Sequence, residues 1–253
     1  MTSLSLHLTS EDLVRYSRQI LFPSFGKEGQ KKLKQSHVLI AGMGGLGSPV
    51  AIYLACAGIG HLTYIDSDSV ELSNLNRQIL HLEKDIGKQK VISATTKLER
   101  LNSAVEIAPK AEEISSENVN ELLEGVSVAI DCLDNMQTRY ILNEGCVSKN
   151  IPLIHGGVYG LMGEVTTIIP GQTPCFECMF PRGNKREEGL FPVFGATPAL
   201  IASLQVMEAI KLIAGFGEVL AGKLLYVNGE NMEFYILNKE IDSTCQTCSG
   251  NKG

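Results

Sequence analysis

The fold is decided by the stretch His37-Val-Leu-Ile-Ala-Gly-Met-Gly-Gly-Leu-Gly47. Its first five residues are mostly apolar and predict a short buried strand, and its glycines predict a tight loop that opens a helix over residues 48–58. A second strand is expected over residues 61–65, and Asp66 stands at its end. Strand, glycine loop, helix, strand and acid follow one another within about 30 residues, as in a nucleotide-binding α/β unit.

The glycine loop predicts a phosphate site. Glycines at this spacing allow a tight turn and a close approach of the backbone, so that N–H groups at the start of the helix can bind phosphate. We therefore expect Gly42, Gly44 and Gly45 to hold a nucleotide, and Asp66 to accept hydrogen bonds from its ribose. Because many dehydrogenases share such a loop, it does not by itself choose the nucleotide.

Charged residues beyond the loop favour ATP. Arg77 follows the ribose acid and Lys90 comes shortly after it. A dinucleotide dehydrogenase has no need of these cations, whereas a triphosphate and a departing pyrophosphate must be stabilised electrostatically. Asp134 comes just after a strand expected over residues 126–130 and would lie over the same crevice, where a carboxylate suits magnesium that bridges phosphates.

Two Cys-x-x-Cys pairs, Cys175/Cys178 and Cys245/Cys248, predict a metal site in the second half of the chain. Four soft thiolate ligands suit tetrahedral zinc. Redox use of one pair is the alternative, although neither pair follows a thioredoxin-like first strand. The other three cysteines lie in apolar contexts and are interpreted as core residues: Cys56, Cys132 and Cys146.

The remaining periodicity continues the alternation of strands and helices. Helices are expected over residues 88–101, 135–149 and 198–213, and strands over 152–154, 163–169, 223–227 and 233–237, the strand at 163–169 entering a different region of the sheet. We therefore predict an α/β protein with a Rossmann-like ATP-binding fold. Its central sheet is mixed and mostly parallel, and its C-terminal strand region is stapled by a four-cysteine zinc site.

Composition excludes several classes of function. The net charge of −6 argues against a nucleic-acid-binding protein, which needs clustered Lys and Arg. No run of 18 or more apolar residues predicts a membrane span, and residues 1–11 lack the pattern of a signal peptide. We expect a cytoplasmic protein, in which the seven cysteines serve as metal ligands or free thiols rather than in disulfides.

Several motifs in combination resemble the MoeB/ThiF/HesA family, bacterial and archaeal adenylyltransferases related to ubiquitin-activating enzymes. The resemblance extends over residues 13–248 and rests on Arg15-Tyr-Ser-Arg-Gln-Ile20, Gly42-Met-Gly-Gly-Leu-Gly-Ser48, Ser73-Asn-Leu-Asn-Arg-Gln78, Asp131-Cys-Leu-Asp-Asn135 and the cysteine pairs. It implies that the protein uses Mg-ATP to adenylate the C-terminal glycine of a small ubiquitin-like sulfur carrier ending in Gly-Gly, with release of pyrophosphate. The product would serve the synthesis of molybdopterin, thiamin or other sulfur-containing compounds.

The resemblance also implies roles for single residues. Arg18 matches an arginine that reaches across a homodimer into the partner's ATP site, and Asp134 would orient magnesium. The residues implied to bind the nucleotide are Gly42, Gly44, Gly45, Asp66, Ser73, Asn74, Arg77, Lys90, Asp134 and Asn135, with Arg18, Arg77, Lys90 and Asp134 in the chemistry. Cys175, Cys178, Cys245 and Cys248 match structural zinc ligands.

One feature departs from part of the family. Many relatives carry a cysteine between the first zinc pair and the long helix, but no cysteine occurs here between Cys178 and Cys245. This puts a covalent link to the carrier in doubt and leaves adenylation untouched. The alternatives are adenylation of a ribosomal peptide or another carboxylate, a nicotinamide dehydrogenase, and a zinc scaffold without catalysis.

The chain is expected to form a single adenylation domain over residues 1–253. Within it we expect an N-terminal helical arm (1–35), a nucleotide-binding core (36–160) and a carrier-binding and zinc region (161–253).

Overall fold

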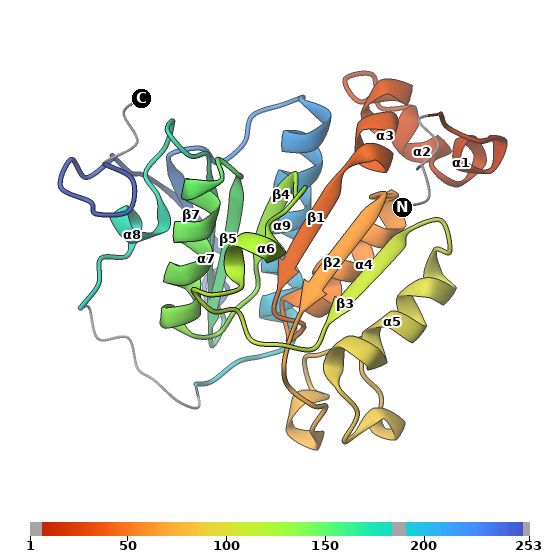
Figure 1. The fold of residues 1–253 in the computed structure, drawn as a ribbon, viewed down its shortest axis with the longest axis horizontal. Helices are drawn as coiled ribbons and strands as arrows, with labels where there is room; N and C mark the ends of the chain where they lie inside the picture. The colour runs from red at the N-terminus through yellow and green to blue at the C-terminus, as the bar shows by residue number, and fades with distance from the viewer. Residues whose placement is uncertain (1–6, 184–190, 250–253) are drawn as a thin grey trace.

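One sheet of eight strands runs through the whole molecule (Figure 1). The computed structural model describes residues 7–183 and 191–249, so residues 184–190, between the first cysteine pair and the long helix, lie outside the described residues. The strand order is β3-β2-β1-β4-β5-β6-β7-β8. The strands are β1 (His37–Ala41), β2 (His61–Ile65), β3 (Glu106–Lys110), β4 (Val128–Asp131), β5 (Leu153–Tyr159), β6 (Met162–Ile168), β7 (Lys223–Asn228) and β8 (Glu233–Asn238).

The sheet has a parallel half and an antiparallel half. Strands β1 to β5 pair in parallel, with Leu39 beside Thr63 of β2 on one side and Ala129 of β4 on the other. Strands β5 to β8 pair antiparallel. The mixed, mostly parallel α/β fold is thereby confirmed. The strand predicted over residues 163–169 is β6, at which the pairing changes direction.

Helices cover both faces of the sheet (Figure 1). One hydrophobic core forms where α3 (Gly26–Gln35), α4 (Gly47–Ala57), α5 (Lys90–Leu101) and α9 (Ala196–Ala214) meet one face. A second core lies on the other face under α6 (Val119–Leu122), α7 (Met136–Ser148) and α8 (Phe176–Met179). Two short helices, α1 (Ser10–Arg15) and α2 (Ser17–Ile20), precede α3.

Two details differ from the sequence predictions. Strand β3 was not predicted, because Pro109 interrupts it; the proline is tolerated since β3 is an edge strand that pairs only with β2. Cys132 and Cys146 are buried as predicted, but Cys56 on α4 is exposed, so the prediction for Cys56 was wrong.

By length and mean hydropathy α9 could cross a membrane. In this fold it is a core helix: Ile201, Ala202 and Ala209 are fully buried, and α9 packs on β5, β6 and α4. Core helices of this kind commonly pass the same test.

The strand order places a crevice at the carboxyl ends of β1 and β4. From β1 the chain proceeds outward to β2 and β3, and then crosses to β4 on the other side of β1. In open parallel sheets, ligands bind where the order reverses in this way. The glycine loop follows β1, and the segment containing Asp134 follows β4, so both lie at this crevice.

Candidate functional site

The glycine loop is built around positions that accept no side chain. Gly42 has a left-handed φ of +92°, and a Cβ on it would lie 2.7 Å from the carbonyl oxygen of Cys132. A Cβ on Gly47 would lie 2.0 Å from the carbonyl oxygen of Gly42. These contacts explain the spacing of the glycines: the turn after β1 closes onto the first residue of α4 and onto the end of β4.

Two helices begin at this loop. Helix α4 starts at Gly47, and a Cβ on Gly45 would lie 3.4 Å from Cγ of Pro198, in the first turn of α9. The N-termini of both helices therefore lie at the loop, where unpaired N–H groups and the helix dipoles favour an anion. The sequence does not signal this second N-terminus, because α9 is distant in the chain.

Asp66 at the end of β2 is tied to the loop. Its Oδ2 accepts a hydrogen bond from Met43 N (2.8 Å), and its Oδ1 accepts one from Asp68 N (2.9 Å). Burial raises the pKa of Asp66, although Lys90 and these two donors favour the ionised form. The carboxylate thus lies beside the loop, where the sequence predicts the ribose.

Lys90 begins α5 and is buried, with 6 % of its surface exposed. Its Nζ lies 2.7 Å from Asp68 Oδ2 and 3.8 Å from Asp66 Oδ1. Lys90 is therefore at the predicted site, but in this structure its charge is paired with two carboxylates.

Arg77 borders the loop at Gly45. A Cβ on Gly45 would lie 3.5 Å from Cγ of Arg77. The guanidinium donates through Nη1 to the carbonyl oxygen of Ser73 (2.9 Å) and to Asn76 Oδ1 (3.0 Å). Asn74 is buried, and its Oδ1 accepts from Glu71 N at 3.1 Å, which holds the turn that carries Ser73.

Asp134 and Asn135 follow β4 and are both exposed. Asn135 caps α7, since its Oδ1 accepts a hydrogen bond from Thr138 N at 2.9 Å. Within residues 7–183 and 191–249, no cationic side chain lies within ion-pair distance of Asp134. An unpaired carboxylate at the crevice fits the oxygen-ligand chemistry of magnesium.

Arg18 is not brought to the glycine loop of its own chain. It lies on α2, next to Tyr16, whose hydroxyl accepts a hydrogen bond from Asn102 just after α5. Arg15 Nη1 donates to the carbonyl oxygen of Leu101 at the end of α5. The arm therefore contacts the C-terminal end of α5, whereas Lys90 is the first residue of that helix (Figure 1).

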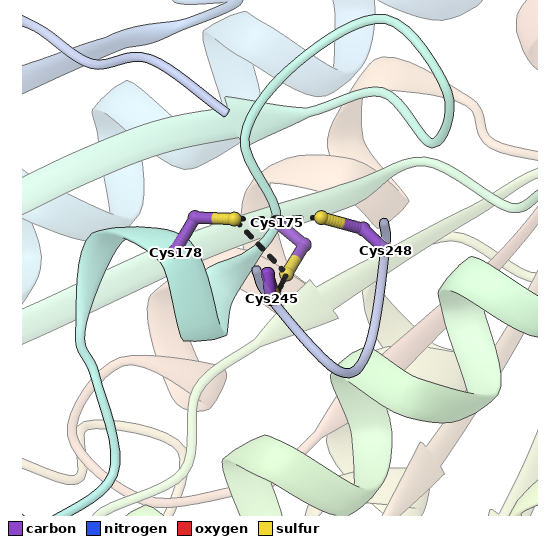
Figure 2. Close-up of side chains that lie close together, drawn as sticks. All are labelled: Cys175, Cys178, Cys245 and Cys248. Atoms are coloured by element: carbon purple, nitrogen blue, oxygen red, sulfur yellow. Dashed lines mark hydrogen bonds between the residues drawn. The ribbon is translucent and has the colours of Figure 1, made fainter. Parts of the chain in front are cut away.

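The four paired cysteines converge although they lie far apart in the chain (Figure 2). Their sulfur atoms all lie within 4.8 Å of one another. The Sγ–Sγ distances include 3.6 Å for Cys175–Cys245 and 3.4 Å for Cys178–Cys248, too long for disulfides. Zn–S bonds of about 2.3 Å in a tetrahedron put sulfurs about 3.8 Å apart. The cluster therefore fits zinc.

The cysteine cluster joins the C-terminus to the second core. Cys175 and Cys245 are buried beside α7 and α8. Burial raises the pKa of Cys248 to about 11, so that binding of a metal to this thiol at neutral pH would release its proton.

Two residues missed in the sequence analysis also line the loop. His81 is buried, and its Nε2 lies 3.4 Å from the carbonyl oxygen of Met43 while Nδ1 lies 3.0 Å from Ser93 Oγ. The backbone N–H of Met43 thus donates to Asp66 Oδ2, and its carbonyl oxygen lies beside the imidazole of His81. The carboxamide of Gln78 adjoins Gly44, with Nε2 3.6 Å from a Cβ placed there. Gln78 closes the motif of residues 73–78 on which the resemblance rests, whereas no local pattern distinguishes His81 from an ordinary polar residue.

The sequence pattern of the ThiF family matches residues 16–248. The chain belongs to the ThiF family. The resemblance predicted from the glycine loop, the motif of residues 73–78, the motif of residues 131–135 and the cysteine pairs is thereby confirmed.

Individual members of the family extend this comparison. The chain is 43% identical over 247 residues to "Adenylyltransferase and sulfurtransferase MOCS3" of Drosophila sechellia, covering 96% of this chain and 54% of that protein. It is 38% identical over 251 residues to "SAMP-activating enzyme E1" of Haloferax volcanii, covering 97% of this chain and 92% of that protein. The chain thus spans about half the length of the MOCS3 proteins it matches.

Solved structures of the same fold include MccB of E. coli. MccB with ATP superposes with a TM-score of 0.83 at 27% identity, covering 93% of this chain and 74% of MccB. A further structure of this protein is described as "Microcin C7 biosynthetic enzyme MccB in complex with N-formylated MccA", with 26% identity, a TM-score of 0.83 and coverage of 92% and 74%.

Proposed function

We propose that this ThiF-family protein is an adenylyltransferase that uses ATP to activate the C-terminal glycine of a small ubiquitin-like sulfur carrier. The observation that carries the proposal is the crevice itself. A glycine-rich loop, two helix N-termini and Arg77 offer a site for phosphates, next to an acid suited to a ribose. Similarity to enzymes named adenylyltransferase and SAMP-activating enzyme E1 supports the same activity.

In the proposed reaction, a carboxylate oxygen of the carrier attacks the α-phosphorus of ATP. The bond from that phosphorus to the bridging oxygen breaks, pyrophosphate leaves with the electron pair, and the carrier becomes an acyl-adenylate. No side chain needs to act as a base, because a C-terminal carboxyl group is already ionised near neutral pH. The chain has to position the reactants and to balance negative charge, which are the roles proposed for the loop and Arg77.

Lys90 requires an exchange of partners in this proposal. Asp68, its nearer partner, has a side chain that is 66% exposed, so leaving it costs little. Asp66 remains close to Lys90 at 3.8 Å. We propose that Lys90 turns from Asp68 to a phosphate while the nucleotide ribose binds to Asp66.

Magnesium and zinc would have separate tasks. Asp134 would hold magnesium, which supplies neutralisation of phosphate charge when bound. Cys175, Cys178, Cys245 and Cys248 would hold zinc as a structural ion. We further propose that the protein is cytoplasmic and that it serves molybdopterin, thiamin or related sulfur-transfer synthesis.

The carrier is proposed to bind the region of residues 161–253. All six residues of β8 are exposed, and among them Phe234, Tyr235, Ile236 and Leu237 are large and mostly apolar. These side chains alternate between the two faces of β8, and large apolar side chains exposed in such number are typical of sites that bind another protein.

ATP–pyrophosphate exchange tests the proposed function. Purified protein with Mg-ATP should incorporate labelled pyrophosphate into ATP only when a carrier ending in Gly-Gly is present. The same carrier without its last two residues is the control and should support no exchange. Absence of exchange with every Gly-Gly carrier would overturn the carrier assignment.

A second candidate is adenylation of a ribosomal peptide or another carboxylate. The structural likeness to the microcin C7 biosynthetic enzyme MccB, solved with N-formylated MccA, favours it as the runner-up. The same assay separates the two, because exchange would then depend on a short peptide and not on a ubiquitin-like carrier.

A homodimer in which Arg18 completes the partner's site is also proposed. Within one chain, α4 separates the arm from the loop: Gly58 at its end adjoins Tyr16, and its 11 residues span about 16 Å at about 1.5 Å per residue. An arginine on α2 is therefore better placed to serve another subunit than its own.

We expect complementation between two variants that are each almost inactive as homodimers. A heterodimer of one Arg18→Ala subunit and one Asp134→Ala subunit, purified with two affinity tags, should show about half the exchange activity of the unmodified dimer. One of its two sites then combines an intact Asp134 with the partner's intact Arg18. Each variant homodimer is the control and should retain only a small residual activity. If Arg18 served its own subunit, both sites of the heterodimer would be damaged and activity would stay near zero.

A further inference from the structure

A cluster of buried charged side chains lies directly beneath the turn that carries Asp134. Asp131, Arg139 and His155 have exposed fractions of 1%, 7% and 0%. They come from three different elements: the end of β4, helix α7 and strand β5. None of them is among the residues proposed to bind the nucleotide.

The cluster forms hydrogen bonds with both backbone polar groups of Leu133. Leu133 N donates to Asp131 Oδ1 at 2.9 Å, and the carbonyl oxygen of Leu133 accepts a hydrogen bond from Arg139 Nη2. Arg139 Nε lies 3.4 Å from Asp131 Oδ2. Leu133 is the residue before Asp134, so these hydrogen bonds fix the position of the backbone from which the Asp134 side chain projects.

His155 holds the central carboxylate of the cluster. Its Nδ1 lies 2.6 Å from Asp131 Oδ2, the oxygen that does not bind Leu133. Burial alone would raise the pKa of Asp131, but the charge of Arg139 and the hydrogen bond from His155 outweigh it, and the pKa is lowered. The acceptor of the Leu133 N–H is therefore an ionised carboxylate.

The imidazole of His155 is itself fixed by packing. The rings of Phe176 and Phe180 meet it edge-on, with centroids 4.9 and 5.3 Å away. Phe176 is anchored to α7 because its N–H donates to Asn143 Oδ1 at 2.9 Å. On the other side of the ring, Nε2 lies 3.6 Å from Glu164 Oε1.

Burying such charges is costly, and a well-packed apolar group of the same volume often stabilises a fold as well or better. Through Leu133, these side chains contact the turn at residues 133–135, which reaches the surface at Asp134 and Asn135. We propose that His155 is a positioning residue: acting through Asp131 and Arg139, it holds this turn, and with it Asp134, in the conformation that the nucleotide site requires. The assignment rests on the proposed adenylation.

A matched pair of substitutions isolates the hydrogen bond. His155→Asn and His155→Leu both replace the ring by a branched side chain with the same number of heavy atoms, but only the asparagine amide can donate to Asp131 Oδ2. We expect His155→Leu to lower kcat for carrier-dependent exchange about tenfold with little change in KM for the carrier, and His155→Asn to retain most of the activity. Equal kcat values for the two variants would overturn the proposal.

A double-substitution cycle tests the route through Asp134. Residues that act as one unit show non-additive effects. His155→Leu should therefore cause no further loss of kcat in an Asp134→Ala background. A further tenfold loss there would show that His155 acts elsewhere.

Hydrogen exchange supplies a readout that does not depend on activity. The amide of Leu133 should exchange at least tenfold faster in His155→Leu than in His155→Asn, because its acceptor is no longer held. Equal exchange rates of the Leu133 amide in the two variants would show that His155 does not hold the turn. If the unmodified protein showed no pyrophosphate exchange with any carrier, the proposed function would fail, whereas this measurement would still decide whether His155 holds the turn.

Discussion

Replacing Arg77 by alanine is expected to lower carrier-dependent ATP–pyrophosphate exchange about a hundredfold, a loss of about 3 kcal/mol of transition-state stabilisation. Arg77 borders the glycine loop beside Gly45, and among the described residues its guanidinium hydrogen-bonds to Ser73 and Asn76 of its own turn. We expect the change to fall mainly on kcat, because charge at the α-phosphate grows as pyrophosphate departs. The assay is initial-rate exchange at saturating carrier, together with thermal unfolding.

The matched control for Arg77 is Lys149→Ala, which removes one exposed positive charge after the far end of α7. This variant should retain the activity of the unmodified protein. Little loss of stability is expected for Arg77→Ala, since its contacts are local and partly exposed. Exchange within a few-fold of the unmodified protein would remove Arg77 from the mechanism.

Loss of the zinc site is expected to have the largest effect on stability. Structural zinc contributes on the order of 10 kcal/mol in small domains, and a loss of even about 3 kcal/mol would lower Tm by roughly 6–12 °C in a domain of this size. The ion would tie the C-terminal segment to α8 and close a long loop, which restricts the unfolded chain. Cys178→Ser and Cys248→Ala should each lower Tm and bound zinc together.

Cys56→Ser is the control for the cysteine substitutions, because Cys56 is exposed on α4 and outside the cluster. It should change neither Tm nor metal content. The folded fraction of Cys178→Ser should keep its exchange activity, since Tyr140 Oη still donates to the carbonyl oxygen of Phe180 at 2.8 Å and holds this segment to α7. Full zinc content in both cluster variants would show that these cysteines are not the ligands.

Local sequence signals were sufficient wherever a structural requirement lies within a few residues. Gly42 and Gly47 can be recognised because the turn between them excludes any Cβ, and apolar runs marked most strands to within two residues. Strand β3 was not predicted, because its residues are only half-buried and include Pro109, so that they form no apolar run. The spacing within each cysteine pair likewise predicted the cluster of four thiols that the fold brings together.

Fewer contacts of the candidate site could be predicted from the sequence. The family motifs pointed to Arg77, Lys90 and Asp134, but not to the pairing of Lys90 with Asp68. Nor did they indicate that α9 begins beside Gly45, because that contact joins residues more than a hundred positions apart. Side chains such as His81 look ordinary in sequence and become part of the site only through their neighbours.

The amino-acid sequence by itself determined the nucleotide-binding unit, the four thiols and the membership of the ThiF family. Each depends on residue types at short, regular spacings, where backbone geometry or ligand number leaves few alternatives. The tertiary structure alone decided that Arg18 lies at the opposite end of α5 from Lys90, and that Asp131, Arg139 and His155 meet beneath Asp134. These positions follow from the strand order and the helix packing, which bring together side chains that are far apart in the sequence and share no regular spacing.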